Sequence, residues 1–166
     1  MAREAFVVGA WCGHAMPGTV ALRCYHAPAM AVLNTNNVGL FARISYNDGQ
    51  NETWAFTEID HSASLGVVST GTRWRRPDDR LGAAFVANGL SPGHRAYLAA
   101  GGYGFIVGDG ALSYGPEQIG ELYYSFALPA YHAAISPDYP LIVDPAYNRA
   151  RNGPVHVVAV RLHVAF

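Results

Sequence analysis

The sequence predicts an all-β fold, an antiparallel meander of membrane type, and three observations support this. Of its 166 residues, 51% are hydrophobic and only 14% are charged, whereas about 25% charged residues is usual in soluble domains. No run of about 20 apolar residues occurs, which excludes a transmembrane helix. Apolar residues instead recur at alternate positions, a spacing that gives a strand one apolar and one polar face.

The last run, Val155 to Phe166, shows this alternation most clearly. One face of the expected strand is wholly apolar, with Val158, Val160, Leu162, Val164 and Phe166. The opposite face carries Arg161 and His163. A charged side chain facing hydrocarbon is costly, so the pattern predicts that the apolar face meets lipid and that the charged face meets water.

Five further runs alternate in the same way, and they cover residues 38–47, 62–70, 81–88, 121–128 and 132–143. The last of these contains Pro137 and Pro140, which lack ladder donors and predict an irregular or bulged strand. The longest connection is expected to hold one short helix. Ser91 can cap it, Pro92 suits its first turn, and Gly101 can end it.

The connections between these runs alternate in length. The shorter ones cover residues 34–37, 73–79 and 128–131, and the mostly longer ones cover 47–53, 90–117 and 144–154. Transmembrane barrels of the bacterial outer membrane have short periplasmic turns and longer outer loops. If the chain ends on the periplasmic side, all three shorter connections fall on that side.

The first 33 residues fit this pattern poorly. Two weak strands are expected, Phe6–Trp11 and Thr19–Tyr25, and prolines interrupt the region. No secretory signal is visible, so we expect that Met1 is not the native start of a full-length protein. We therefore divide the chain into a divergent or truncated segment, 1–33, and a barrel-like segment, 34–166.

From about Asn34 onward the sequence resembles the carbohydrate-selective porin family (OprB-type). Six blocks in family order carry the resemblance: residues 38–49, 52–60, 76–85, 121–124, 136–148 and 161–166. The resemblance implies the C-terminal part of an outer-membrane β-barrel through which sugars diffuse passively. It implies sugars, outer-membrane lipid and the outer-membrane assembly machinery as partners, and Phe166 as the assembly signal. No cofactor is implied.

Parity along the strands gives candidates for a channel lining. Polar residues assigned to the non-lipid faces are Arg43, Glu58, Asp60, Glu121, Asp138, Arg161 and His163. Aromatic residues of the same parity, Phe41, Trp54 and Tyr123, suit stacking on sugar rings. Tyr124 and Tyr131 fit an aromatic belt near a membrane interface. Each of these residues also has a structural interpretation, as an ion pair within the wall or an ordinary strand residue.

Three other interpretations compete with a sugar-conducting fragment. The first is a non-conducting remnant with the same strands, and the second is a soluble β-sandwich that binds carbohydrate. The third is an enzyme that uses Glu58 and Asp60 as paired carboxylates, but no nucleophile motif accompanies them. We expect no enzyme and no metal site, although Cys12-x-His14 and Cys24-x-His26 resemble ligand pairs. A net charge of −1 gives nucleic acid no electrostatic support.

Overall fold

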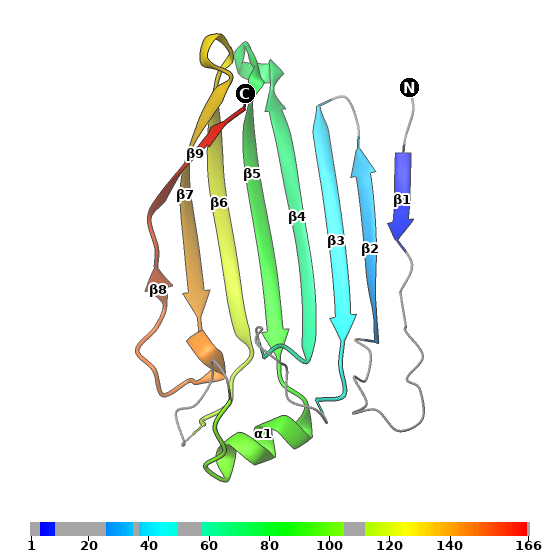
Figure 1. Cartoon of the computed structure of the whole chain (residues 1–166), viewed down its shortest axis with the longest axis vertical. Helices are drawn as coiled ribbons and strands as arrows, with labels where there is room; N and C mark the ends of the chain where they lie inside the picture. Colours follow the sequence, from blue (N-terminus) through cyan, green and yellow to red (C-terminus); the bar gives the residue numbers. More distant parts are fainter. Residues whose placement is uncertain (1–3, 9–25, 35–36, 50–57, 105–111, 166) are drawn as a thin grey trace.

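The structure is a computed structural model that describes residues 4–8, 26–34, 37–49, 58–104 and 112–165. These residues form one antiparallel sheet whose strands follow one another in chain order (Figure 1). The strands are β1 (Glu4–Val8), β2 (His26–Asn34), β3 (Val38–Tyr46), β4 (His61–Gly71), β5 (Arg76–Gly89), β6 (Glu117–Leu128), β7 (Ala133–Val143), β8 (Val155–His156) and β9 (Ala159–Val164). Both β8 and β9 pair with β7. The predicted all-β meander is confirmed.

Six consecutive strands are long enough to cross a membrane. A spanning strand needs about 9–11 residues, and β2 to β7 contain 9, 9, 11, 14, 12 and 11 residues. β5 begins at Arg76 and β6 at Glu117, earlier than the alternation alone predicts. The reason is that ladder pairing continues past the apolar positions, as the pairs Gly71–Arg76 and Asn88–Glu117 show.

Two features of the strands differ from the prediction. β2 was not predicted, because Pro28 breaks its alternation. In the structure, a register shift between His26 and Ala29 accommodates this proline. The final run is not one strand but two short ones, β8 and β9, separated at residues 157–158. This interruption faces Tyr139 and Pro140 of β7, so the irregularity predicted from the prolines lies in the pairing and not in β7 itself.

One face of the sheet is apolar and open. Register places Leu65 between Ala42 and Phe85, and Leu122 between Ala83 and Tyr139. These side chains stay exposed, for example Leu65 at 59% and Leu162 at 68%. In the described part of the chain no second sheet covers them. The β-sandwich interpretation required Val158, Val160, Leu162 and Val164 to be buried, and it is therefore wrong.

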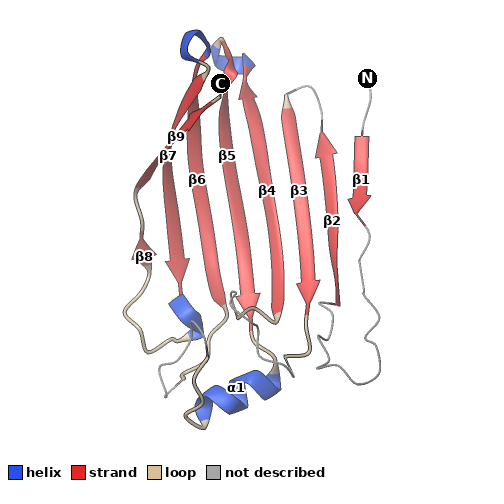
Figure 2. Cartoon of the chain, in the orientation of Figure 1, coloured by secondary structure: helices blue, strands red, loops and turns tan. Residues whose placement is uncertain are grey.

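The two ends of the sheet differ (Figure 2). One end carries the short turns η1 (Thr72–Trp74) and η2 (Pro129–Tyr131). The other carries α1 (Pro92–Ala99), the short helix η3 (Pro145–Tyr147) and the longer connections. As predicted, Ser91 caps α1, where its side chain accepts a hydrogen bond from the His94 amide at 3.2 Å. No described helix has the length and apolar character needed to traverse a bilayer.

Candidate functional site

The polar face of the sheet brings four of the predicted lining residues together. Arg161 of β9 donates a hydrogen bond to Glu121 of β6 at 3.0 Å and forms an ion pair with Asp138 of β7 at 3.0 Å. Its guanidinium carbon lies 5.3 Å from the ring centroid of Tyr123. Tyr123 and Asp138 are direct partners in the β6–β7 ladder, so three neighbouring strands build this group. We call Glu121, Tyr123, Asp138 and Arg161 the Arg161 cluster.

The charges of the Arg161 cluster do not balance. One guanidinium faces two carboxylates, and the Asp138 side chain is only 8% exposed whereas that of Arg161 is 55% exposed. The Asp138 Oδ1 atom is buried and accepts no hydrogen bond from any described residue. A buried acceptor without a partner is unfavourable, so this atom adds to the local excess of negative charge. Arg161 can donate further hydrogen bonds from its exposed nitrogens.

A glycine allows Tyr123 to lie along the sheet. Gly82 is the ladder partner of Tyr123 in β5, and a Cβ at Gly82 would overlap the Tyr123 ring. The same arrangement recurs in β3 and β4, where the ring of Phe41 occupies the space above Gly66. Two aromatic rings are thus laid flat against the polar face, and this gives them surfaces on which an apolar ring face can stack.

We expect Gly82→Ala to displace Tyr123 and to cost about 1 kcal/mol of unfolding free energy, because the added methyl overpacks the ring. The control is Gly120→Ala, since a Cβ at Gly120 meets nothing within 4 Å. That change should be neutral or stabilising by about 0.4–1 kcal/mol, because it restricts the unfolded chain. Urea unfolding in lipid vesicles measures both values, and equal values for the two variants would contradict this packing.

Glu58 and Asp60 are placed differently from expectation. They do not belong to a strand; they precede β4 at the α1 end, and each is only 3% exposed. Asp60 accepts from the Ser91 amide at 2.7 Å and contacts His94 Nδ1 at 3.0 Å. The Glu58 carbonyl accepts from Tyr147 at 2.9 Å. The Asp60 backbone still bonds to Asn47 and Gly89 at the end of the sheet, but polar partners from the α1 cap and η3 hold these two residues in a buried position.

These contacts attach the loops to the sheet around a small core. Leu90, Leu98 and Tyr147 are buried there, and Arg95 lies over the ring of Tyr114 at 4.5 Å. Burial raises the pKa of Tyr147, and the nearby Glu117 carboxylate adds to the effect. This end of the molecule is therefore a packed cap and not an open surface.

The Asp60 contacts predict that the cap loosens in acid. Burial alone would raise the pKa of Asp60, but the hydrogen bonds from His94 and Ser91 outweigh it and hold the pKa below its ordinary value. A lowered pKa stabilises the fold above the unfolded value of about 3.9, and this contribution is lost as the pH falls through the lower folded value. Hydrogen exchange at the Ser91 amide, corrected for intrinsic rates, should show easier opening below about pH 4. Asp60→Asn should be open already at pH 7, and an unchanged Ser91 amide in that variant would contradict the assignment.

The sequence did not lead us to predict a buried carboxylate at the turn end. Asp79 is 1% exposed and accepts from Arg76, from the Tyr124 hydroxyl at 2.7 Å and from the Ala127 amide at 2.9 Å. Tyr124 in turn accepts from Trp74 at 2.7 Å. The signal was present in Arg-Pro-Asp-Asp before β5, but alternation says nothing about a charged residue at a strand end.

The other sequence candidates are scattered. Arg43 and His163 are exposed at polar-face positions, where their ladder partners are Ser64 and Ala134. Tyr124 and the 75% exposed Tyr131 lie at the turn end, as an aromatic belt requires. Trp54, Phe166 and the cysteines with His14 fall outside the described residues.

A single sheet with an open apolar face, a polar face and aromatic residues at its turn end defines a transmembrane β-sheet protein. The sequence profile of the carbohydrate-selective porin, OprB family, matches residues 25–166. The chain belongs to this family. The match begins at residue 25, inside the segment 1–33, which none of the six resembling blocks covers. Neither the curated proteins nor the solved structures gave a match.

Proposed function

We propose that this sheet forms part of the wall of a passive sugar channel in the bacterial outer membrane. Its apolar face would lie toward lipid and its polar face toward the channel. Membership of the carbohydrate-selective porin family supports the substrate class. The two-faced sheet supports the membrane arrangement. Diffusion follows the sugar gradient and needs no cofactor. The proposed lining residues among those described on this face are Phe41, Arg43, Glu121, Tyr123, Asp138, Arg161 and His163.

The Arg161 cluster is the observation that carries this proposal. A sugar offers hydroxyls around its edge and an apolar ring face. Carboxylates and a guanidinium match the hydroxyls, and an aromatic ring matches the apolar face. The cluster presents both kinds of group within one patch of the polar face. Glu58 and Asp60, at the α1 end, would act as supports for the loops around the channel mouth.

Reconstitution of the purified chain in planar bilayers tests the proposal. We expect ion conductance that neutral sugars reduce in a saturable way, because bound sugar obstructs the channel. Tyr123→Ala should raise the half-saturating sugar concentration roughly 2- to 12-fold, which corresponds to the about 0.5–1.5 kcal/mol of an aromatic contact. Arg149→Gln, at an exposed residue of the α1 end, is the control and should leave the half-saturating concentration unchanged. Sugar block that is insensitive to Tyr123→Ala would refute the assigned lining.

A second candidate is a sheet that inserts in the membrane but does not conduct. The observation that favours it is the open sheet, because in the described ranges no pairing joins β1 to β8 or β9. Absence of conductance in a correctly inserted chain would support this candidate. Phe166 is proposed as the recognition signal for the assembly machinery under both candidates.

A further inference from the structure

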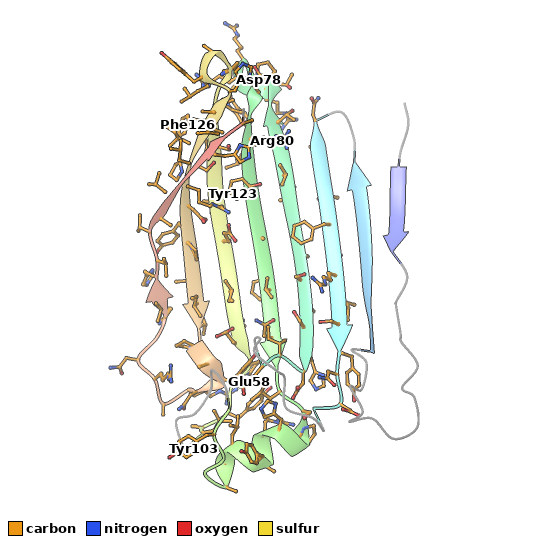
Figure 3. All side chains as sticks on the ribbon, viewed as in Figure 1. Glu58, Asp78, Arg80, Tyr103, Tyr123 and Phe126 are labelled. Carbon is orange, nitrogen blue, oxygen red and sulfur yellow. The ribbon has the colours of Figure 1, made fainter. Side chains whose placement is uncertain are left out.

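The turn between β4 and β5 concentrates positive charge at one end of the sheet. The chain contains 11 Arg and Lys residues in total, and four arginines lie between residues 73 and 80. Arg73, Arg75 and Arg80 are exposed, and none of them forms an ion pair with another described residue. Arg76 is paired with Asp79, and Asp78 is exposed. Figure 3 shows Asp78 and Arg80 at this end, well away from Glu58.

The opposite end of the sheet has the opposite balance. Four arginines against two aspartates leave two positive charges at the turn end. Three arginines face five carboxylates at the α1 end, among side chains that the structure describes: Arg95, Arg149 and Arg151 against Asp48, Glu58, Asp60, Glu117 and Asp144. The molecule is therefore electrically asymmetric along its strands, with the positive end at the short turns.

The positive turn has a defined geometry. Asn37 accepts from Thr70 at 3.3 Å and from Thr72 at 3.2 Å, which ties the turn to the start of β3. Arg75 adopts a left-handed conformation with φ 64°, and its amide donates to the Thr72 carbonyl at 3.3 Å. A Cβ at Gly71 would collide with the Arg76 carbonyl, so the tight approach needs glycine there. Arg73 and Arg75 therefore project from a pre-formed support.

This turn borders the apolar face directly. Trp74 is 36% exposed and donates to Tyr124, whose ring lies 4.4 Å from that of Phe126. Phe126 and Leu81 belong to the exposed apolar face. Indole and phenol groups favour the level of lipid headgroups. Arg73 and Arg75 thus lie where the apolar face ends, at the depth of phosphates in a bilayer, whereas Arg80 lies on the polar face of β5.

We infer that the turn formed by Arg73, Trp74 and Arg75 binds the phosphate headgroup of an anionic phospholipid, and that this anchors the turn end of the sheet in the periplasmic leaflet. The inference rests on the proposed membrane insertion. Charge complementarity selects an anionic headgroup over a zwitterionic one, since each arginine near such a surface adds attraction. Continuity with the apolar face selects a lipid over a soluble phosphate.

Quenching of Trp74 fluorescence by brominated lipids tests the inference. The parent chain carries Trp11→Phe and Trp54→Phe, so that Trp74 alone reports, and it is reconstituted in phosphatidylcholine vesicles with or without phosphatidylglycerol. The ratio of the two lipids' association constants at Trp74 is the measured quantity. We expect phosphatidylglycerol to be favoured at least about 5-fold at low salt, and to lose this preference at 1 M salt.

The test variant is Arg73→Gln with Arg75→Asn, because asparagine tolerates the left-handed conformation at position 75. Removing two arginines can lower the phosphatidylglycerol preference by up to about 30-fold, at about 1 kcal/mol for each arginine. We therefore expect the ratio of the two association constants to fall to near one. Arg149→Gln with Arg151→Gln makes the same charge change at the other end and should keep the preference. Arg73→Lys with Arg75→Lys should also keep it.

The outcomes distinguish a failure of membrane insertion from a failure of the headgroup site alone. If Trp74 is quenched by neither brominated lipid, the sheet does not insert, and the proposed function itself fails. If both lipids quench Trp74 equally in the parent chain, the sheet inserts but the headgroup site is wrong. A preference that survives in the Arg73→Gln, Arg75→Asn variant, or that vanishes in the Arg149→Gln, Arg151→Gln control, also overturns the site.

Discussion

Phe85→Lys is expected to destabilise the inserted sheet by about 2–4 kcal/mol, the cost of a lysine on the lipid face near the bilayer midplane. Phe85 lies inside β5, its ladder partners are Leu65 and Gly120, and it is 40% exposed on the apolar face. In lipid this side chain contacts hydrocarbon, so an ammonium group there loses its water. Urea unfolding from phosphatidylcholine vesicles measures the loss.

The neighbouring residue provides a matched control. Ala84 lies on the polar face, and its ladder partners are Gly66 and Glu121. Ala84→Lys introduces the same charge into the same strand, but beside a carboxylate and water. We expect a change within about 0.5 kcal/mol, as for ordinary surface substitutions. Equal costs at the two positions would show that the faces are assigned wrongly.

Asp79→Ala is expected to cost about 2–4 kcal/mol of unfolding free energy. The Asp79 carboxylate accepts hydrogen bonds from Arg76, Tyr124 and the Ala127 amide, and it is 1% exposed. Hydrogen bonds to charged groups contribute about 1.5–3 kcal/mol each and are not additive. Their loss leaves the Ala127 amide without this acceptor and releases the end of β6 from β5.

Asp78 supplies the control for this change. It is the adjacent aspartate in β5 but is exposed. Asp78→Ala should therefore alter the unfolding free energy by less than about 0.5 kcal/mol. Asp79→Asn should fall between the two, because an amide oxygen still accepts from Ala127 and Tyr124. A ranking in which Asp78→Ala costs as much as Asp79→Ala would show that the carboxylate network does not stabilise the turn end.

The alternation of apolar and polar residues predicted the long central strands well. β3, β4 and β7 lie within two residues of the expected runs, because a strand between lipid and water must place every second residue on each side. The α1 cap was also predictable, since Ser91 and Pro92 are local signals. The Arg161 cluster followed in part, because parity assigned Glu121, Asp138 and Arg161 to one face.

Tertiary contacts explain what the sequence did not predict. β2 contains Pro28, and only pairing with β1 and β3 makes its path extended. Glu58 and Asp60 were assigned by parity to a strand, but their partners come from helices far along the chain. Arg161 contacts Glu121 and Asp138 because of the register between β9 and β7. Alternation assigns residues to faces but does not determine this register.

The central claim, that one face of this sheet meets lipid and the other meets water, is tested most directly by scanning β5. Single cysteines are placed at residues 83 to 87 of a chain in which Cys12 and Cys24 are replaced by serine, and each is labelled with a nitroxide in phosphatidylcholine vesicles. We predict that labels at 83, 85 and 87 are accessible to dissolved oxygen, and that labels at 84 and 86 are accessible to a water-soluble nickel complex. Equal accessibility along the strand, or alternation of the opposite phase, would contradict the account.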